Sequence, residues 1–123
     1  MKIPFLDLQP LTARQRDELV AAATRVIDRG WFILGSELES FEKEFAEWNG
    51  SAHTIGVGTG LDALSLTLRA WREMGRLQAG DEVIVPANTY IATWLAVSYA
   101  GAAPVPVEPD PTTYNIDPGL IEA

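Results

Sequence analysis

The chain has 123 residues, a net charge of −8, 47% hydrophobic residues and no cysteine. This length suits one modest domain, and the acidic balance argues against a nucleic-acid partner, because binding phosphate backbones requires a surplus of Lys and Arg. The lack of cysteine excludes disulfides and Cys-ligated metals. No apolar run approaches the ~20 residues of a membrane span, and no apolar signal segment opens the sequence, so we expect a cytoplasmic protein without a membrane partner.

The first third of the chain predicts an arm followed by two helices. Residues 3–10 indicate an extended arm, and apolar spacing predicts a helix over about 12–29, ended by Gly30. An apolar loop follows over 31–35. Ser36 and Glu39 have the spacing of a capping box, which predicts that a second helix opens there and runs to Asn49-Gly50. We therefore expect two parts: an N-terminal arm, helix and loop over 1–35, and the first part of a larger domain over 36–123.

From residue 53 onward the predicted elements alternate between strand and helix. Strands are expected at 53–57, 82–85 and 104–107, and helices at about 61–74 and 89–100. This alternation predicts an α/β layer whose strands are mostly parallel and flanked by helices. The strands are apolar at both odd and even positions, which predicts a sheet covered on both faces.

The last residues predict the opening of another helix. Asp117 is a favourable N-cap and Pro118 a favourable first helical residue. Three strands are few for a doubly wound sheet. We therefore expect the chain to be a piece of a longer protein.

The strongest chemical signal is the glycine-rich turn at 58–60, between a predicted strand and a predicted helix. Glycines let a backbone come close to a ligand, and the helix that follows directs its free N–H groups and positive dipole end at the same point. The Thr59 hydroxyl adds a donor, so this turn predicts a phosphate site. The alternative is that the glycines serve the turn alone.

A dinucleotide would be a different phosphate ligand for the same turn. Gly58, Gly60 and Ala63 match the loose dinucleotide fingerprint, which calls for an acidic residue at the far end of the second strand. Here Asp81 and Glu82 stand at the beginning of that strand, on the wrong edge of the sheet. The pattern therefore disfavours a nicotinamide cofactor.

A tyrosine follows the second predicted strand. Ligands of open α/β sheets lie at the carboxyl ends of the strands, so Tyr90 and the turn at 58–60 are expected on one edge. An aromatic side chain there can lie flat on a planar cofactor ring. The alternative is that Tyr90 packs between helices as ordinary core.

Five blocks in this order resemble a known family, and they cover nearly all of the chain. They are Trp31-Phe32-Ile33-Leu34-Gly35, Gly58-Thr59-Gly60-Leu61-Asp62-Ala63-Leu64, Gly80-Asp81-Glu82-Val83-Ile84-Val85-Pro86, Asn88-Thr89-Tyr90-Ile91-Ala92-Thr93 and Gly101-Ala102-Ala103-Pro104-Val105. The sequence resembles the DegT/DnrJ/EryC1/StrS aminotransferases, which act on nucleotide-linked keto-sugars.

The resemblance implies a fold-type-I enzyme dependent on pyridoxal 5'-phosphate, with this chain as the N-terminal part of its large domain. It implies a homodimer, a phosphate site at Thr59 and Gly60, and Tyr90 against the pyridine ring. The amino donor would be glutamate, and the acceptor a nucleotide-linked keto-deoxysugar, aminated at C3 of a dTDP-6-deoxyhexose.

The resemblance also implies that the catalytic machinery lies outside this chain. The family's Schiff-base lysine and ring-nitrogen aspartate come after residue 123. The two lysines of the chain are Lys2, in the arm, and Lys43, on the polar face of a helix among Glu42 and Glu44. We therefore expect no catalytic residue here and an inactive isolated chain.

Two alternatives stay open. A fold-type-I sugar dehydratase would lack the Schiff-base lysine. That position lies after residue 123, so this sequence does not exclude a dehydratase. A non-catalytic phosphate-binding α/β module would need a complete C-terminal element. The helix predicted to begin at Pro118 is cut short by the end of the sequence, which argues against this alternative.

Overall fold

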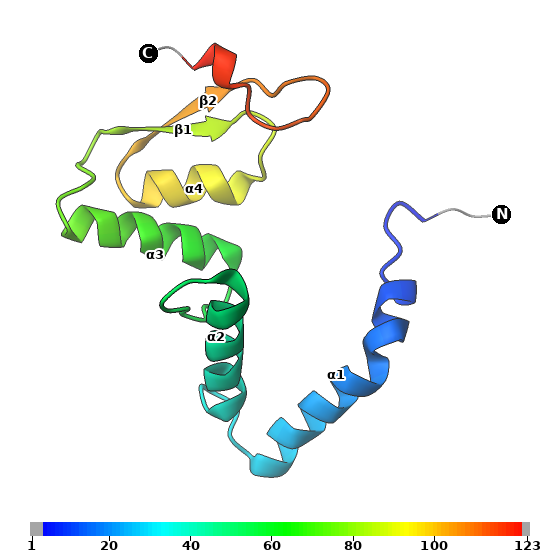
Figure 1. Cartoon of the computed structure of the whole chain (residues 1–123). Coiled ribbons are helices and arrows are strands. Elements are labelled where there is room, and N and C mark those ends of the chain that lie inside the picture. Colours follow the sequence, from blue (N-terminus) through cyan, green and yellow to red (C-terminus); the bar gives the residue numbers. More distant parts are fainter. Residues whose placement is uncertain (1–3, 122–123) are drawn as a thin grey trace. The chain divides into compact units, whose positions relative to one another are not determined.

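The computed structural model describes residues 4–121 and divides the chain into two compact units, 1–56 and 57–123. Figure 1 colours the first unit blue to teal and the second green to red. The first unit holds two helices, and the second unit holds a small sheet with its helices. The boundary expected between residues 35 and 36 concerns the whole protein and stays a prediction.

The first helix, α1 (Gln9–Arg29), begins three residues earlier than predicted. Pro10 stands in its first turn, where the missing N–H leaves no bond unmade, and the Asp7 carboxylate accepts the Gln9 N–H at 3.1 Å. The predicted arm is correspondingly shorter. Residues 1–3, including Lys2, lie outside the described residues.

The second helix, α2 (Ser36–Asn49), begins where expected, but the predicted capping box is wrong. Gly35 occupies the N-cap position, and its carbonyl accepts the Glu39 N–H at 3.1 Å. Ser36 is already helical, so it lacks the extended backbone from which an N-cap hydroxyl reaches a free amide. Its hydroxyl instead accepts a hydrogen bond from Arg29.

The second unit is built from a parallel strand pair and the helices around it. Its elements are α3 (Gly60–Glu73), β1 (Glu82–Pro86), α4 (Ile91–Tyr99), β2 (Ala103–Val107) and a short 3-10 turn (Pro118–Leu120). Strands β1 and β2 pair in parallel with Val85 opposite Pro106, and α4 forms the crossover between them. One buried cluster joins them: Leu68, Leu77, Val85, Ala96, Val97, Ala100 and Ala102. The predicted α/β class, a partial parallel sheet flanked by helices, is confirmed.

Two expectations about the sheet are wrong for the described residues. No strand forms at 53–57, because a strand requires a paired neighbour and the Gly56 N–H bonds the Glu42 carboxylate instead, at 2.7 Å. Within residues 4–121 the sheet also has one covered face. Val83 and Val85 pack toward the helices, whereas Glu82 and Ile84 are exposed.

The predicted cap at Asp117 is confirmed. Its carboxylate accepts the Gly119 N–H at 2.8 Å and opens the 3-10 turn.

Candidate functional site

Two backbone donors at the start of α3 have no hydrogen-bond partner among residues 4–121. Thr59 is the N-cap, with an extended backbone and a hydroxyl oxygen that accepts the Asp62 N–H at 3.1 Å. The Thr59 carbonyl accepts the Ala63 N–H, also at 3.1 Å. Gly60 and Leu61 are the first two helical residues, so no carbonyl of the preceding helical turn exists to accept their N–H groups, which remain available. Together with the positive end of the helix dipole, they form a point suited to an anion.

Packing within the chain explains the glycine at 58, where a Cβ would lie 3.3 Å from Asp62 Oδ2, but not the glycine at 60. Gly58 and Gly60 both lie outside the left-handed backbone region, and a Cβ on Gly60 would meet no atom within 4 Å. Neither backbone conformation nor packing therefore requires glycine at 60. This disfavours the interpretation that it serves the turn alone and leaves room for a close ligand.

A carboxylate lies beside these donors. The Thr59 hydroxyl donates to Asp62 Oδ2 at 2.8 Å, and that oxygen would be 3.3 Å from a Cβ on Gly58. The predicted donor Thr59 is thus already bonded within the chain. The Asp62 carboxylate thus orients the Thr59 hydroxyl. Its negative charge also repels an anion bound at the same helix start.

Tyr90 stands at the start of α4 with its side chain 79% exposed. This exposure excludes the alternative that Tyr90 is part of the core of the second unit. Figure 1 shows α3 and α4 starting on the same side of that unit, the side toward which the β1 arrow points. The structure therefore places Thr59, Gly60 and Tyr90 at one end of the unit.

The donor set fits a phosphorylated aromatic molecule. The N–H groups of Gly60 and Leu61 match phosphate oxygens, and the exposed Tyr90 ring can cover a planar heterocycle. Both groups come from one unit, on helices that start on the same side.

Sequence reasoning missed Asn88. Its amide Nδ2 donates to the Tyr114 carbonyl at 3.1 Å, across 26 residues of sequence. A polar residue in a loop carries no periodic signal, so only the coordinates reveal this bond.

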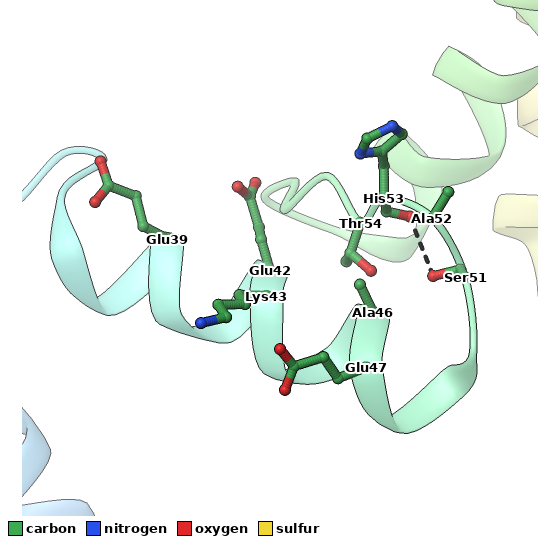
Figure 2. A pocket seen from close by; sticks show the side chains of 9 residues that line it. All are labelled: Glu39, Glu42, Lys43, Ala46, Glu47, Ser51, Ala52, His53 and Thr54. Atoms are coloured by element: carbon green, nitrogen blue, oxygen red, sulfur yellow. Dashed lines mark hydrogen bonds between the residues drawn. The ribbon is translucent and has the colours of Figure 1, made fainter.

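The first unit contains a cavity of about 460 Å³ between α2 and residues 51–54. Figure 2 shows that the carboxylates Glu39, Glu42 and Glu47 line it beside the single cation Lys43. This excess of negative charge is unfavourable for a phosphate. Lys43 is exposed on α2, which confirms the expected surface lysine.

The described residues contain neither a metal-binding cluster nor a helix that could cross a membrane. Over residues 4–121, no group of three or more His, Cys, Asp or Glu side chains is arranged to hold a metal ion. In the same part of the chain, no helix combines the length and apolar character needed to cross a membrane.

Comparison with known proteins identifies relatives along nearly the whole chain. The chain is 54% identical over 120 residues to the dTDP-3-amino-3,6-dideoxy-alpha-D-galactopyranose transaminase of Aneurinibacillus thermoaerophilus, covering 98% of this chain and 32% of the relative. The Streptomyces venezuelae DesV structure, solved in complex with a ketimine intermediate, is 50% identical with a TM-score of 0.80, covering 97% of this chain and 31% of that chain.

A dehydratase is also similar. The E. coli GDP-4-keto-6-deoxy-D-mannose-3-dehydratase with bound hydrated PLP is 32% identical with a TM-score of 0.74, covering 80% of this chain and 26% of that chain. The chain thus spans about a third of the length of the curated relatives it matches.

A family description matches residues 13–123, the whole of the second unit and most of the first. On this match and the shared fold, the chain belongs to the DegT/DnrJ/EryC1/StrS aminotransferase family.

Proposed function

We propose that this chain forms the part of a pyridoxal-phosphate-dependent aminotransferase that binds the cofactor. The phosphate site at Thr59 and Gly60 uses the Gly60 N–H, because the Thr59 hydroxyl is bonded to Asp62, and Tyr90 lies against the pyridine ring. The observation that carries the proposal is the pair of N–H groups at the start of α3, at the same end of the second unit as an exposed aromatic ring.

The whole protein, in this proposal, transfers an amino group from an amino acid, glutamate, to a nucleotide-linked keto-deoxysugar at C3 of a dTDP-6-deoxyhexose. The Aneurinibacillus relative, a dTDP-3-amino-3,6-dideoxy-alpha-D-galactopyranose transaminase, supports this substrate class. The protein works in the cytoplasm as a homodimer. Residues 1–35 form its arm, helix and loop, and residues 36–123 open its large domain.

When bound, pyridoxal phosphate supplies an electron sink for the transfer of the amino group. The chain's own residues bind and orient. The Gly60 and Leu61 N–H groups fix the phosphate without a charged side chain, and Tyr90 shields one ring face from water. The catalytic lysine is assigned to another part of the whole protein, because the family resemblance implies a position after residue 123, and the exposed Lys43 on α2 agrees with this assignment.

The full-length protein tests this function directly. It should convert a dTDP-linked 3-keto-6-deoxyhexose and glutamate into the amino sugar and 2-oxoglutarate, detected by mass spectrometry. Removal of a sugar hydroxyl without nitrogen in the product would favour the second candidate, a sugar dehydratase, which the 32% identity to the E. coli enzyme supports.

The 123-residue chain provides a second test. Titrated with pyridoxal phosphate and reduced with borohydride, it should form no stoichiometric covalent adduct. An adduct traced to Lys2 or Lys43 would contradict the assignment of the catalytic lysine to another part of the protein.

A further inference from the structure

An exposed ring can hold a cofactor only if its backbone is fixed. Tyr90 is 79% exposed and makes no side-chain cap bond, so the packing of its own ring does not hold it in place. Stacking on a mobile loop would lose much of its free energy to ordering that loop on binding. The contacts that hold residues 87–90 therefore bear directly on the proposed site.

Backbone bonds hold this loop from the side of the sheet. The Ala87 N–H donates to the Val107 carbonyl at 2.8 Å and extends the β1–β2 pairing by one residue. The Thr89 N–H donates to the Pro86 carbonyl at 3.2 Å, which closes a turn. These bonds fix the start of the loop.

The Asn88 side chain ties the loop to a second one. Its Nδ2 donates at 3.1 Å to the carbonyl of Tyr114, in the loop that follows β2. Tyr114 has a φ of 60°, an uncommon value for a residue with a side chain.

The loop after β2 is held by hydrogen bonds of its own. Asp110 Oδ1 accepts the N–H groups of Thr112 at 2.9 Å and Thr113 at 2.8 Å. The Asp110 carbonyl accepts the Tyr114 N–H at 2.8 Å, and Pro109 and Ile116 form an antiparallel bridge. A carbonyl fixed in this way is a firm anchor for Asn88.

We propose that Asn88 is a positioning residue for Tyr90: by bonding the Tyr114 carbonyl it holds the loop after β1 so that the ring meets the cofactor in one orientation. This inference rests on the proposed function. It assigns the Tyr114 carbonyl a role in bracing the cofactor site, although no side chain of that loop needs to touch the ligand.

The test compares Asn88→Asp with Asn115→Asp in the full-length holoprotein. Aspartate matches asparagine in shape but cannot donate to the Tyr114 carbonyl. Asn115→Asp makes the same chemical change in the neighbouring loop, at a side chain that makes no hydrogen bond within the described residues; the Asn115 backbone N–H is bonded there to Thr113 Oγ1 at 3.4 Å. Two quantities are measured: the Kd of pyridoxal phosphate, and the circular dichroism of the bound cofactor in its visible band.

Asn88→Asp should raise the Kd about five- to tenfold, the scale of one lost hydrogen bond, and should reduce the cofactor's dichroism. Asn115→Asp should leave both unchanged. Asn88→Ala, which removes the donor without adding charge, should repeat the result and serves if the aspartate variant fails to fold.

The outcome that overturns the inference is a lower melting temperature in both Asn88 variants with an unchanged Kd and dichroism, because that result describes a merely structural contact. Tyr90→Ala separates the two proposals. If it weakens cofactor binding while the Asn88 variants do not, the positioning role fails and the proposed function stands. If Tyr90→Ala leaves the Kd unchanged, the stacking role in the proposed function fails, and the Asn88 inference that rests on it fails too.

Discussion

Asp62 brings opposing effects to the start of α3. Its N–H and its carboxylate both form hydrogen bonds with the Thr59 side chain, which fixes the N-cap. Its negative charge in the first turn also stabilises the helix, because it faces the positive end of the helix dipole. The same charge opposes a phosphate at the N–H groups of Gly60 and Leu61. Stability and anion affinity should therefore respond to Asp62 in opposite directions.

We predict that Asp62→Asn in the full-length protein binds pyridoxal phosphate more tightly and unfolds more easily. Removing a repulsion of about 1 kcal/mol between nearby charges in water corresponds to a roughly fivefold lower Kd. The loss of a helix–dipole interaction should cost about 0.3–1 kcal/mol in urea unfolding.

Glu82→Gln is the matched control for Asp62→Asn. It removes one negative charge at the start of β1, the end of the strand opposite to the loop that carries Tyr90. The control should leave the Kd unchanged. An Asp62→Asn variant that binds the cofactor no better than the wild type would show that the carboxylate does not face the phosphate.

Asp110 gives the loop after β2 a dependence on pH. Hydrogen bonds from the Thr113 and Thr112 amides lower the pKa of Asp110 below its usual value. A lowered pKa in the folded state means that the carboxylate stabilises the fold above the unfolded pKa, and that this stabilisation is lost as the pH falls through the folded value.

We predict that the stability gap between wild type and Asp110→Asn is present at pH 7 and shrinks as the pH falls below about 4, the usual pKa of an aspartate. Urea unfolding of both proteins between pH 7 and pH 3 measures the gap. A gap that stays constant over this range would contradict the role of the charge.

The elements that could be predicted from sequence are those with a local cause. β1 was predicted to begin at Glu82 and does so, and the predicted capping role of Asp117 is confirmed, because both depend on neighbouring residues. The strand predicted at 53–57 does not form in the described residues, because a strand exists only through pairing with a neighbour, which the local sequence does not encode. Helix α4 begins at Ile91 rather than Thr89, since the Thr89 N–H closes a turn with Pro86.

The same distinction holds for the candidate site. The order strand, glycine turn, helix and aromatic indicated Thr59, Gly60 and Tyr90 from the sequence. Asn88 was not indicated, because its partner is 26 residues away and its contact depends on the conformation of Tyr114. The residues expected to touch a ligand could therefore be named from sequence, and the one proposed to position them could not.

Helices α3 and α4 are joined by a charged side chain at the end of α4. The guanidinium Nη1 of Arg72 donates to the Ala100 carbonyl at 2.9 Å, and a Cβ on Gly101 would stand 2.9 Å from that same nitrogen. Gly101 also has a φ of 76°, which disfavours any side chain. A side chain at residue 101 would therefore have two costs: the strain of a positive φ and the displacement of the Arg72 guanidinium.

We predict that Gly101→Ala destabilises the protein more than Gly75→Ala, as measured by urea unfolding. Gly75 has a similar φ of 71° but no atom within 4 Å of an added Cβ, so its substitution costs only the backbone strain, about 1–2 kcal/mol. The excess at Gly101 measures the displacement of Arg72 from Ala100. Equal losses would mean that Arg72 moves aside freely.

The whole second unit leaves one face of its sheet open. Parallel sheets occur almost only where both faces are covered, and this parallel pair is covered on one. A groove of about 300 Å³ runs along the open face and is lined by Ile84, Val105 and Leu120, among others. Because the curated relatives are about three times longer, we infer that the rest of the full-length protein covers this face.

We predict that Ile84→Lys distinguishes the chain from the whole protein. Ile84 is 45% exposed in the chain, so the variant should change the stability of the 123-residue protein little, whereas Val85, 2% exposed, should not tolerate lysine in either context. In the full-length protein Ile84→Lys would bury an unpaired charge, so its melting temperature should drop by several degrees, since about 1 kcal/mol shifts it by ~2–4 °C in a large domain. Thermal unfolding of the four variant proteins measures this contrast. A full-length Ile84→Lys protein as stable as the wild type would mean that solvent, and not a second layer of helices, meets this face of the sheet.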